Sequence, residues 1–118
     1  MTSMIRLMLM LAVAAGLCLA ADATGKWSGT IVMEGEKAPG YMVLEQKGAA
    51  VTGTAGPSAA RQRKIETGAA EGNQVTVEAR PGPVLLKFVM QQDGDKLAGE
   101  VFEDGQRIGT VRLQRVKE

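Results

Sequence analysis

Apolar and polar residues alternate along most of the chain after residue 25, and glycines interrupt the pattern at intervals of about eight to twelve residues. Strict alternation is typical of a strand with one buried face, whereas an amphipathic helix repeats its apolar positions every three to four residues. No stretch sustains that helical repeat. The pattern therefore predicts an antiparallel all-β fold whose strands are joined mostly by tight turns.

Eight strands are expected from the alternation. They cover residues 26–34, 41–46, 50–55, 64–70, 74–80, 84–91, 96–102 and 107–116. The longer connections are predicted to be a turn over residues 35–40, an irregular segment over residues 57–64 and a break at Pro81-Gly82-Pro83. Prolines cannot donate to a strand ladder, so the last of these should separate two strands firmly.

One face of the expected strands carries the apolar residues that should point inward. They are Trp27, Ile31, Met33, Met42, Leu44, Val51, Val75, Val77, Leu86, Phe88, Met90, Leu97, Val101, Val111 and Leu113. Four small residues share this face: Gly29, Gly53, Ala79 and Gly99. Two interpretations stay open, because small inward residues either let strands approach around a packed core or leave a cavity for a slim apolar ligand.

Residues 44–53 and 90–99 repeat one order of residues: an apolar residue, a glutamine, a turn glycine and a second glycine five positions later. This repeat predicts two similar hairpins in one sheet. A sheet of eight short strands either closes into an up-and-down barrel or splits into a two-layer β-sandwich. Closure removes exposed edges, so the barrel is favoured and the sandwich is the alternative.

The first 23 residues are expected to be a cleaved signal peptide. Residues 7–19 carry no charge, but they are too few to span a membrane as a helix, which takes about 20 residues. Small residues then allow cleavage after Ala23, with a second possible site after Ala20. Residues 24–118 would form a single β-barrel domain without a membrane span.

Cys18 is the only cysteine, and Leu17 before it breaks the pattern of an acylated lipoprotein cysteine. It should therefore leave with the signal peptide, so that the mature chain has no disulfide and no thiolate. Export without disulfides is ordinary in a bacterial envelope, and we expect a periplasmic or extracellular bacterial protein.

The composition argues against several functions. The chain has no histidine, which is the commonest general base and transition-metal ligand. We therefore expect no enzyme activity, no metal site and no cofactor. The formal net charge of +1 gives no electrostatic reason to expect a nucleic-acid partner.

Gly25-Lys26-Trp27 at the start of the first expected strand resembles the G-x-W motif of the calycins, the group of lipocalins, avidins and their relatives. The resemblance implies an eight-stranded barrel closed at one end by Trp27, with Arg115 of the last strand stacked on the ring. The chain is shorter than a typical lipocalin, and it lacks both the lipocalin disulfides and the several tryptophans of an avidin biotin pocket. Biotin binding is therefore not implied.

Two functions follow as hypotheses. The first is a binder of a small apolar ligand inside the barrel. Its candidate residues are Trp27, Ile31, Met42, Leu44, Phe88, Met90 and Arg115. The second is a protein-interaction or structural module of the envelope with a filled core. It would act through its outer surface or the 57–64 segment, with Arg61, Arg63 and Lys64 as contact residues.

Overall fold

A computed structural model gives the structure of the chain and describes residues 22–80 and 82–117. The strands within these residues are β1 (Gly25–Met33), β2 (Glu36–Lys47), β3 (Ala50–Ser58), β4 (Arg61–Lys64), β5 (Thr67–Glu71), β6 (Gln74–Ala79), β7 (Leu86–Asp93), β8 (Lys96–Glu103) and β9 (Gln106–Arg115). No helix in this part of the chain is long and apolar enough to cross a membrane. All but the last two residues of the predicted signal peptide lie outside the described residues.

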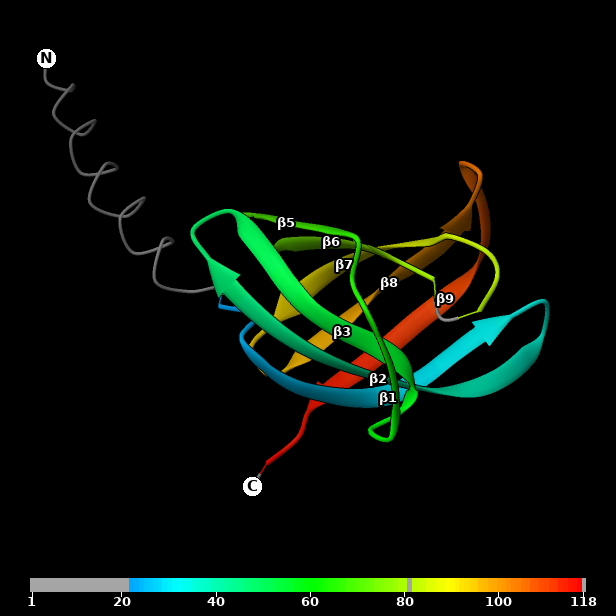
Figure 1. Cartoon of the computed structure of the whole chain (residues 1–118), viewed down its shortest axis with the longest axis horizontal. Coiled ribbons are helices and arrows are strands. Elements are labelled where there is room, and N and C mark those ends of the chain that lie inside the picture. The colour runs from blue at the N-terminus through cyan, green and yellow to red at the C-terminus, as the bar shows by residue number, and fades with distance from the viewer. Residues whose placement is uncertain (1–21, 81, 118) are drawn as a thin grey trace, which may run out of the picture.

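The strands form one antiparallel sheet that closes on itself (Figure 1). β1 pairs with β2 on one side and with β9 on the other, where Trp27 lies opposite Arg115 and Met33 lies opposite Gly109. β4 and β5 both pair with β3 and so share one position in the barrel; β5 corresponds to the fourth predicted strand over residues 64–70. The predicted eight-stranded antiparallel barrel is therefore confirmed, and the sandwich alternative is wrong.

The connection after β1 is shorter than predicted. Glu34 and Gly35 form the turn with φ angles of 51° and 81°, and β2 already begins at Glu36. The predicted turn over residues 35–40 is therefore wrong for most of its length. Pro39 fits into this part of β2 because β3 pairs with β2 only from Tyr41 onwards, which leaves one edge of β2 without a strand partner here.

Residues 57–64 form a hairpin, and the predicted irregular segment is wrong. β3 continues to Ser58 and β4 returns from Arg61, with a register shift between Ala55 and Ser58. The Gln62 side chain fixes the hairpin: its Oε1 accepts a hydrogen bond from Thr54 Oγ1 at 2.7 Å, and its Nε2 donates to the carbonyl oxygen of Ser58 at 2.8 Å. Gln62 lies between Arg61 and Arg63, so β4 has no apolar alternation and the pattern missed the strand.

The barrel interior is the core. The inward residues expected from the alternation are buried, except for Ile31 and Met33, which are partly buried against the rest. Ala23, Ala55 and Ile65 join this core without having been predicted. One polar residue, Gln92, is also buried, with 6% of its surface exposed.

The repeated hairpins match each other in the structure. Gly48 and Gly94 occupy their turns with φ angles of 61° and 62°. Gly53 and Gly99 lie in close contact with the backbone of the neighbouring strand. A Cβ atom on Gly53 would lie 1.9 Å from the carbonyl oxygen of Val43, and one on Gly99 would lie 1.9 Å from that of Val89. The small inward residues at these positions therefore allow close approach of strands and do not line a cavity.

Candidate functional site

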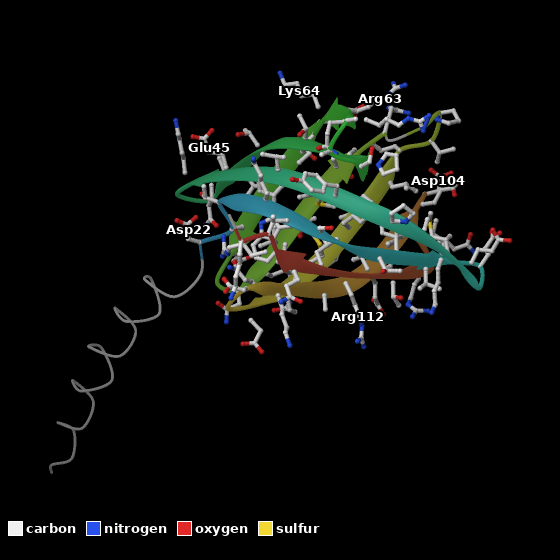
Figure 2. The ribbon with its side chains drawn as sticks, turned by 90° about the horizontal axis from the view of Figure 1, so that it is seen from below. Asp22, Glu45, Arg63, Lys64, Asp104 and Arg112 are labelled. Atoms are coloured by element: carbon white, nitrogen blue, oxygen red, sulfur yellow. The ribbon has the colours of Figure 1, made fainter. Side chains whose placement is uncertain are left out.

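The two ends of the barrel differ. The start of β1 and the turns β2–β3, β5–β6 and β7–β8 form one end, and the turns β1–β2, β3–β4 and β8–β9 with the β6–β7 connection form the other. Asp22 marks the first end and Asp104 the second (Figure 2).

Trp27 closes the first end. Its side chain is completely buried, and its Nε1 donates a hydrogen bond to the carbonyl oxygen of Ala23 at 2.9 Å. The Arg115 guanidinium lies over the indole ring at 4.4 Å from the ring centroid, as the resemblance to the calycins implied. Arg115 Nε also donates to Asp95 Oδ1 at 2.8 Å, which holds the guanidinium in place. Trp27 and Arg115 therefore cover this end of the barrel.

A cavity of about 490 Å³ occupies the other end. Its walls come from the ends of six strands and from the β6–β7 connection. The lining residues are Ile31, Met33, Glu34, Ala38, Pro39, Gly40, Tyr41, Met42, Ala55, Gly56, Pro57, Gly82, Pro83, Val84, Leu86, Phe88, Glu103, Ile108 and Leu113. Almost all of these side chains are apolar. The cavity thus offers a largely apolar wall at this end of the barrel.

The structure brings three of the predicted ligand residues to the cavity wall: Ile31, Met42 and Phe88. Leu44 and Met90 are buried deeper in the core and do not line the cavity. Trp27 and Arg115 lie at the closed end. The predicted set thus separates into a cavity wall, a packed middle and a plug.

Several lining residues were not predicted, because they lie in segments that were expected to be turns or loops. Pro39 and Gly40 belong to β2, Pro57 belongs to β3, and Pro83 belongs to the β6–β7 connection. Val84 was expected in the strand over residues 84–91, but it lies in this connection because β7 begins at Leu86. Val84 is 40% exposed, which is unusual for a large apolar side chain in this barrel. An apolar residue beside such a proline, as at Val84, was the available signal for a cavity wall. A connection exposed only to water rarely needs large apolar side chains.

Glu34 and Glu103 are the charged side chains among the described residues that line the cavity. Neither belongs to any ion pair found in the described residues, where the acidic partners are Glu45, Glu66, Glu100 and Asp95. The mouth of the cavity therefore combines an apolar wall with two carboxylates and no lining cation.

Arg61, Arg63 and Lys64 are exposed on β4. Arg63 and Lys64 point away from the barrel, on the side opposite Arg112 (Figure 2). A second hollow, lined by Arg63, Lys64, Ile65, Glu66 and Arg80, lies beside them. Arg80 Nε is paired with Glu66 Oε2 at 2.9 Å, so the excess positive charge in this hollow comes from β4.

No group of three or more acidic, histidine or cysteine side chains in the described residues is arranged to hold a metal ion. One carboxyl group has a shifted pKa: hydrogen bonds from the backbone N–H and the side chain of Thr24 hold the pKa of Asp22 below its ordinary value. Asp22 lies at the closed end, away from the cavity.

These features define an all-β protein with a closed eight-stranded antiparallel barrel, plugged at one end and hollow at the other. The architecture is compatible with a calycin-like fold. Comparison of the chain with models of known protein families, with curated proteins and with solved structures gave no match.

Proposed function

We propose that this protein is an exported, non-enzymatic barrel of calycin-like build that carries a small apolar molecule in the open end of the barrel. The observation that carries the proposal is the cavity of about 490 Å³ with its apolar wall. Sites for small molecules in proteins have volumes of about 300–1,000 Å³ and are lined mainly by apolar side chains around a few polar groups. The periplasm or the extracellular space is the proposed location.

The plug supports the carrier function because it covers the end of the barrel opposite the cavity. Trp27 and Arg115 seal the far end, and Phe88 and Leu113 form part of the wall nearer the packed middle. A ligand entering between the turns would bury its apolar part against these side chains and keep its head group at the mouth. Removal of apolar surface from water supplies the affinity.

Glu34 and Glu103 restrict the charge that the polar head group of the ligand can carry. A carboxylate or phosphate at the mouth would face two negative charges with no lining cation to offset them, which disfavours an anionic ligand. A neutral hydroxyl would donate a hydrogen bond to either carboxylate, and an ammonium group would also gain an attractive charge interaction. The proposed ligand class is therefore a slim apolar molecule with a neutral or cationic donor group.

Three probes with the same twelve-carbon chain test this class: dodecylamine, 1-dodecanol and dodecanoate. Binding is measured by titration calorimetry at pH 7 with chain 21–118. We expect the amine and the alcohol to bind more tightly than dodecanoate, and Glu34→Gln with Glu103→Gln to reduce that preference. Equal binding of all three would refute the charge preference alone, whereas no binding by any of them would refute the carrier function.

Filling the cavity provides a second test. Ala55 is buried in the cavity wall, so Ala55→Leu places three further carbon atoms in the space for the ligand. We expect at least a tenfold loss of dodecylamine affinity, about 1.4 kcal/mol. Ala98→Leu on the exposed face of β8 is the matched control and should bind as the parent does. Unchanged affinity in a folded Ala55→Leu variant would contradict the proposal.

The natural ligand is accessible through native mass spectrometry of the protein recovered from the envelope of an expressing bacterium. A reproducible adduct of stoichiometric amount, released on denaturation, would identify the ligand class. A bare polypeptide that also binds none of the twelve-carbon probes would favour the second candidate function.

That second candidate is an interaction module of the envelope, and the exposed cations of β4 favour it. Arg61, Arg63 and Lys64 have no acidic partner in the described ion pairs and present their charge on one short strand. An anionic envelope partner would bind there. Replacing all three with glutamine should abolish co-purification of such a partner, and undiminished recovery would rule out this surface.

A further inference from the structure

We infer that the exported chain begins at Ala21, through cleavage after Ala20, and that Asp22 and Ala23 belong to the folded barrel. The inference rests on the proposed export, since only an exported chain loses a signal peptide. Both Cys18-Leu19-Ala20 and Ala21-Asp22-Ala23 offer small residues at the two positions that a signal peptidase reads, so the sequence leaves the site undecided. The contacts of Asp22 and Ala23 distinguish the two sites.

Ala23 is part of the core. It is completely buried, and both of its backbone polar groups have partners. Its N–H donates to Gln46 Oε1 at 2.9 Å, and its carbonyl oxygen accepts the Trp27 indole N–H at 2.9 Å. Trp27 is the plug of the closed end, and its indole nitrogen is a donor only. Loss of Ala23 would leave that donor without its acceptor and uncover one side of the plug.

Asp22 contacts two strands, β7 and β9, at the same end. Its carbonyl oxygen accepts a hydrogen bond from Gln92 Nε2 of β7 at 3.0 Å and one from Arg115 Nη2 of β9 at 3.1 Å. Gln92 is the one buried polar side chain in the described core, and its Oε1 has no partner, so its amide depends on the acceptors of Nε2. The Gly94 carbonyl oxygen accepts the other hydrogen of Nε2 at 3.0 Å, so loss of Asp22 would leave one of the two N–H groups of this buried amide without its acceptor.

Cleavage after Ala23 would also create a charge conflict. The new terminal ammonium group would belong to Thr24, whose carbonyl oxygen accepts a hydrogen bond from Arg115 Nη1. Two positive groups would then lie close together, and the carboxylate of Asp22, which now accepts the Thr24 N–H at 3.0 Å, would be gone. Cleavage after Ala20 keeps the Asp22 carboxylate and leaves all of these contacts of residues 22–24 intact.

The intact mass of the protein tests the inference directly. The full chain is expressed with its own leader in a bacterium, and the protein is purified from the envelope fraction. We expect the mass of residues 21–118. The mass of residues 24–118 would overturn the site while leaving export in place, whereas the uncleaved mass of the full chain, or a mass with lipid on Cys18, would overturn the processing altogether.

A second measurement tests the structural role of the two residues. Chains 21–118 and 24–118 are produced without a leader, and their thermal unfolding is compared. We expect the Tm of the shorter chain to be lower by at least about 5 °C, and equal Tm values would refute the role. Trp27→Phe removes the indole donor, so in this background the difference between the two chain lengths should shrink. An undiminished difference would show that Ala23 does not act through Trp27.

Discussion

The stacking of Arg115 on Trp27 makes a quantitative prediction about the closed end of the barrel. The perturbation is a double-mutant cycle of Trp27→Leu and Arg115→Met, in which methionine keeps an apolar stem of similar length. If the guanidinium stabilises the fold through the indole ring, the two changes together should cost less than the sum of the single changes. The difference is the coupling free energy between the two side chains.

The geometry sets the size of this coupling. A cation over an aromatic ring contributes about 0.5–1 kcal/mol at an exposed site and about 2 kcal/mol when desolvated. Trp27 is completely buried and the Arg115 side chain is 26% exposed, so the pair lies between these limits. We expect a coupling of about 1–2 kcal/mol. Arg115→Met alone should cost somewhat more, since Arg115 also donates to the carbonyl oxygens of Asp22 and Thr24.

Urea unfolding of the four proteins, followed by far-UV circular dichroism, measures the coupling. Fluorescence is unsuitable because Trp27 is the only tryptophan. A second cycle of Asp95→Asn and Arg115→Met is the control. The Asp95 side chain is 55% exposed, so its ion pair should contribute well under about 1 kcal/mol and weaken with salt. A Trp27–Arg115 coupling within about 0.5 kcal/mol of zero would refute the reasoning.

Three further changes have defined outcomes. Gly99→Ala places a Cβ atom against the Val89 carbonyl oxygen and should destabilise the barrel by about 1–3 kcal/mol or more in urea unfolding; a cost below about 0.5 kcal/mol would contradict the close approach. Phe88→Ala removes a buried ring and should cost about 3–5 kcal/mol in the same assay, and a cost under about 1 kcal/mol would mean that the ring is not packed. The lowered pKa of Asp22 implies a stabilising contribution that is present above its ordinary value of 3.8 and lost as the pH falls through the lower pKa of the folded state. Asp22→Asn should therefore reduce the acid sensitivity of the Tm below pH 4, and identical acid profiles would count against the hydrogen bonds from Thr24.

The architecture was accessible from the sequence because strand parity is a local property. The alternation through Val111, Leu113 and Arg115 places the arginine on the inner face, and the resemblance to the calycins then implied that it stacks on Trp27. The repeated glycines were equally informative, since a turn and a close approach of strands both exclude a side chain.

The cavity could not be predicted in the same way. Its wall includes Pro39, Pro57 and Pro83, and proline at such positions was interpreted as a break in the strands. The sequence does not distinguish a proline at the unpaired edge of a strand from a proline in a loop. Only the pairing of the neighbouring strands distinguishes the two cases. The volume of the cavity likewise depends on which residues reach across the open end, and this is a property of the whole barrel.

The role of Gln92 was also hidden from the sequence. It continues the inward parity of Met90, but a polar residue near a turn is usually exposed. Its partner, the carbonyl oxygen of Asp22, lies 70 positions away along the chain. A contact of this kind between a strand end and the residues ahead of the first strand leaves no local pattern.

Barrel closure leaves short stretches of strand edge without a partner in the described pairings, among them the first residues of β2 and the outer edge of β4. Open edges are the usual route by which β-proteins aggregate. The first stretch contains Lys37 and Pro39, and the second carries Arg61, Arg63 and Lys64. Two copies meeting along β4 would bring like charges together, and Pro39 cannot donate to an incoming strand. Charge and proline at these edges therefore disfavour edge-to-edge pairing of two copies of the chain.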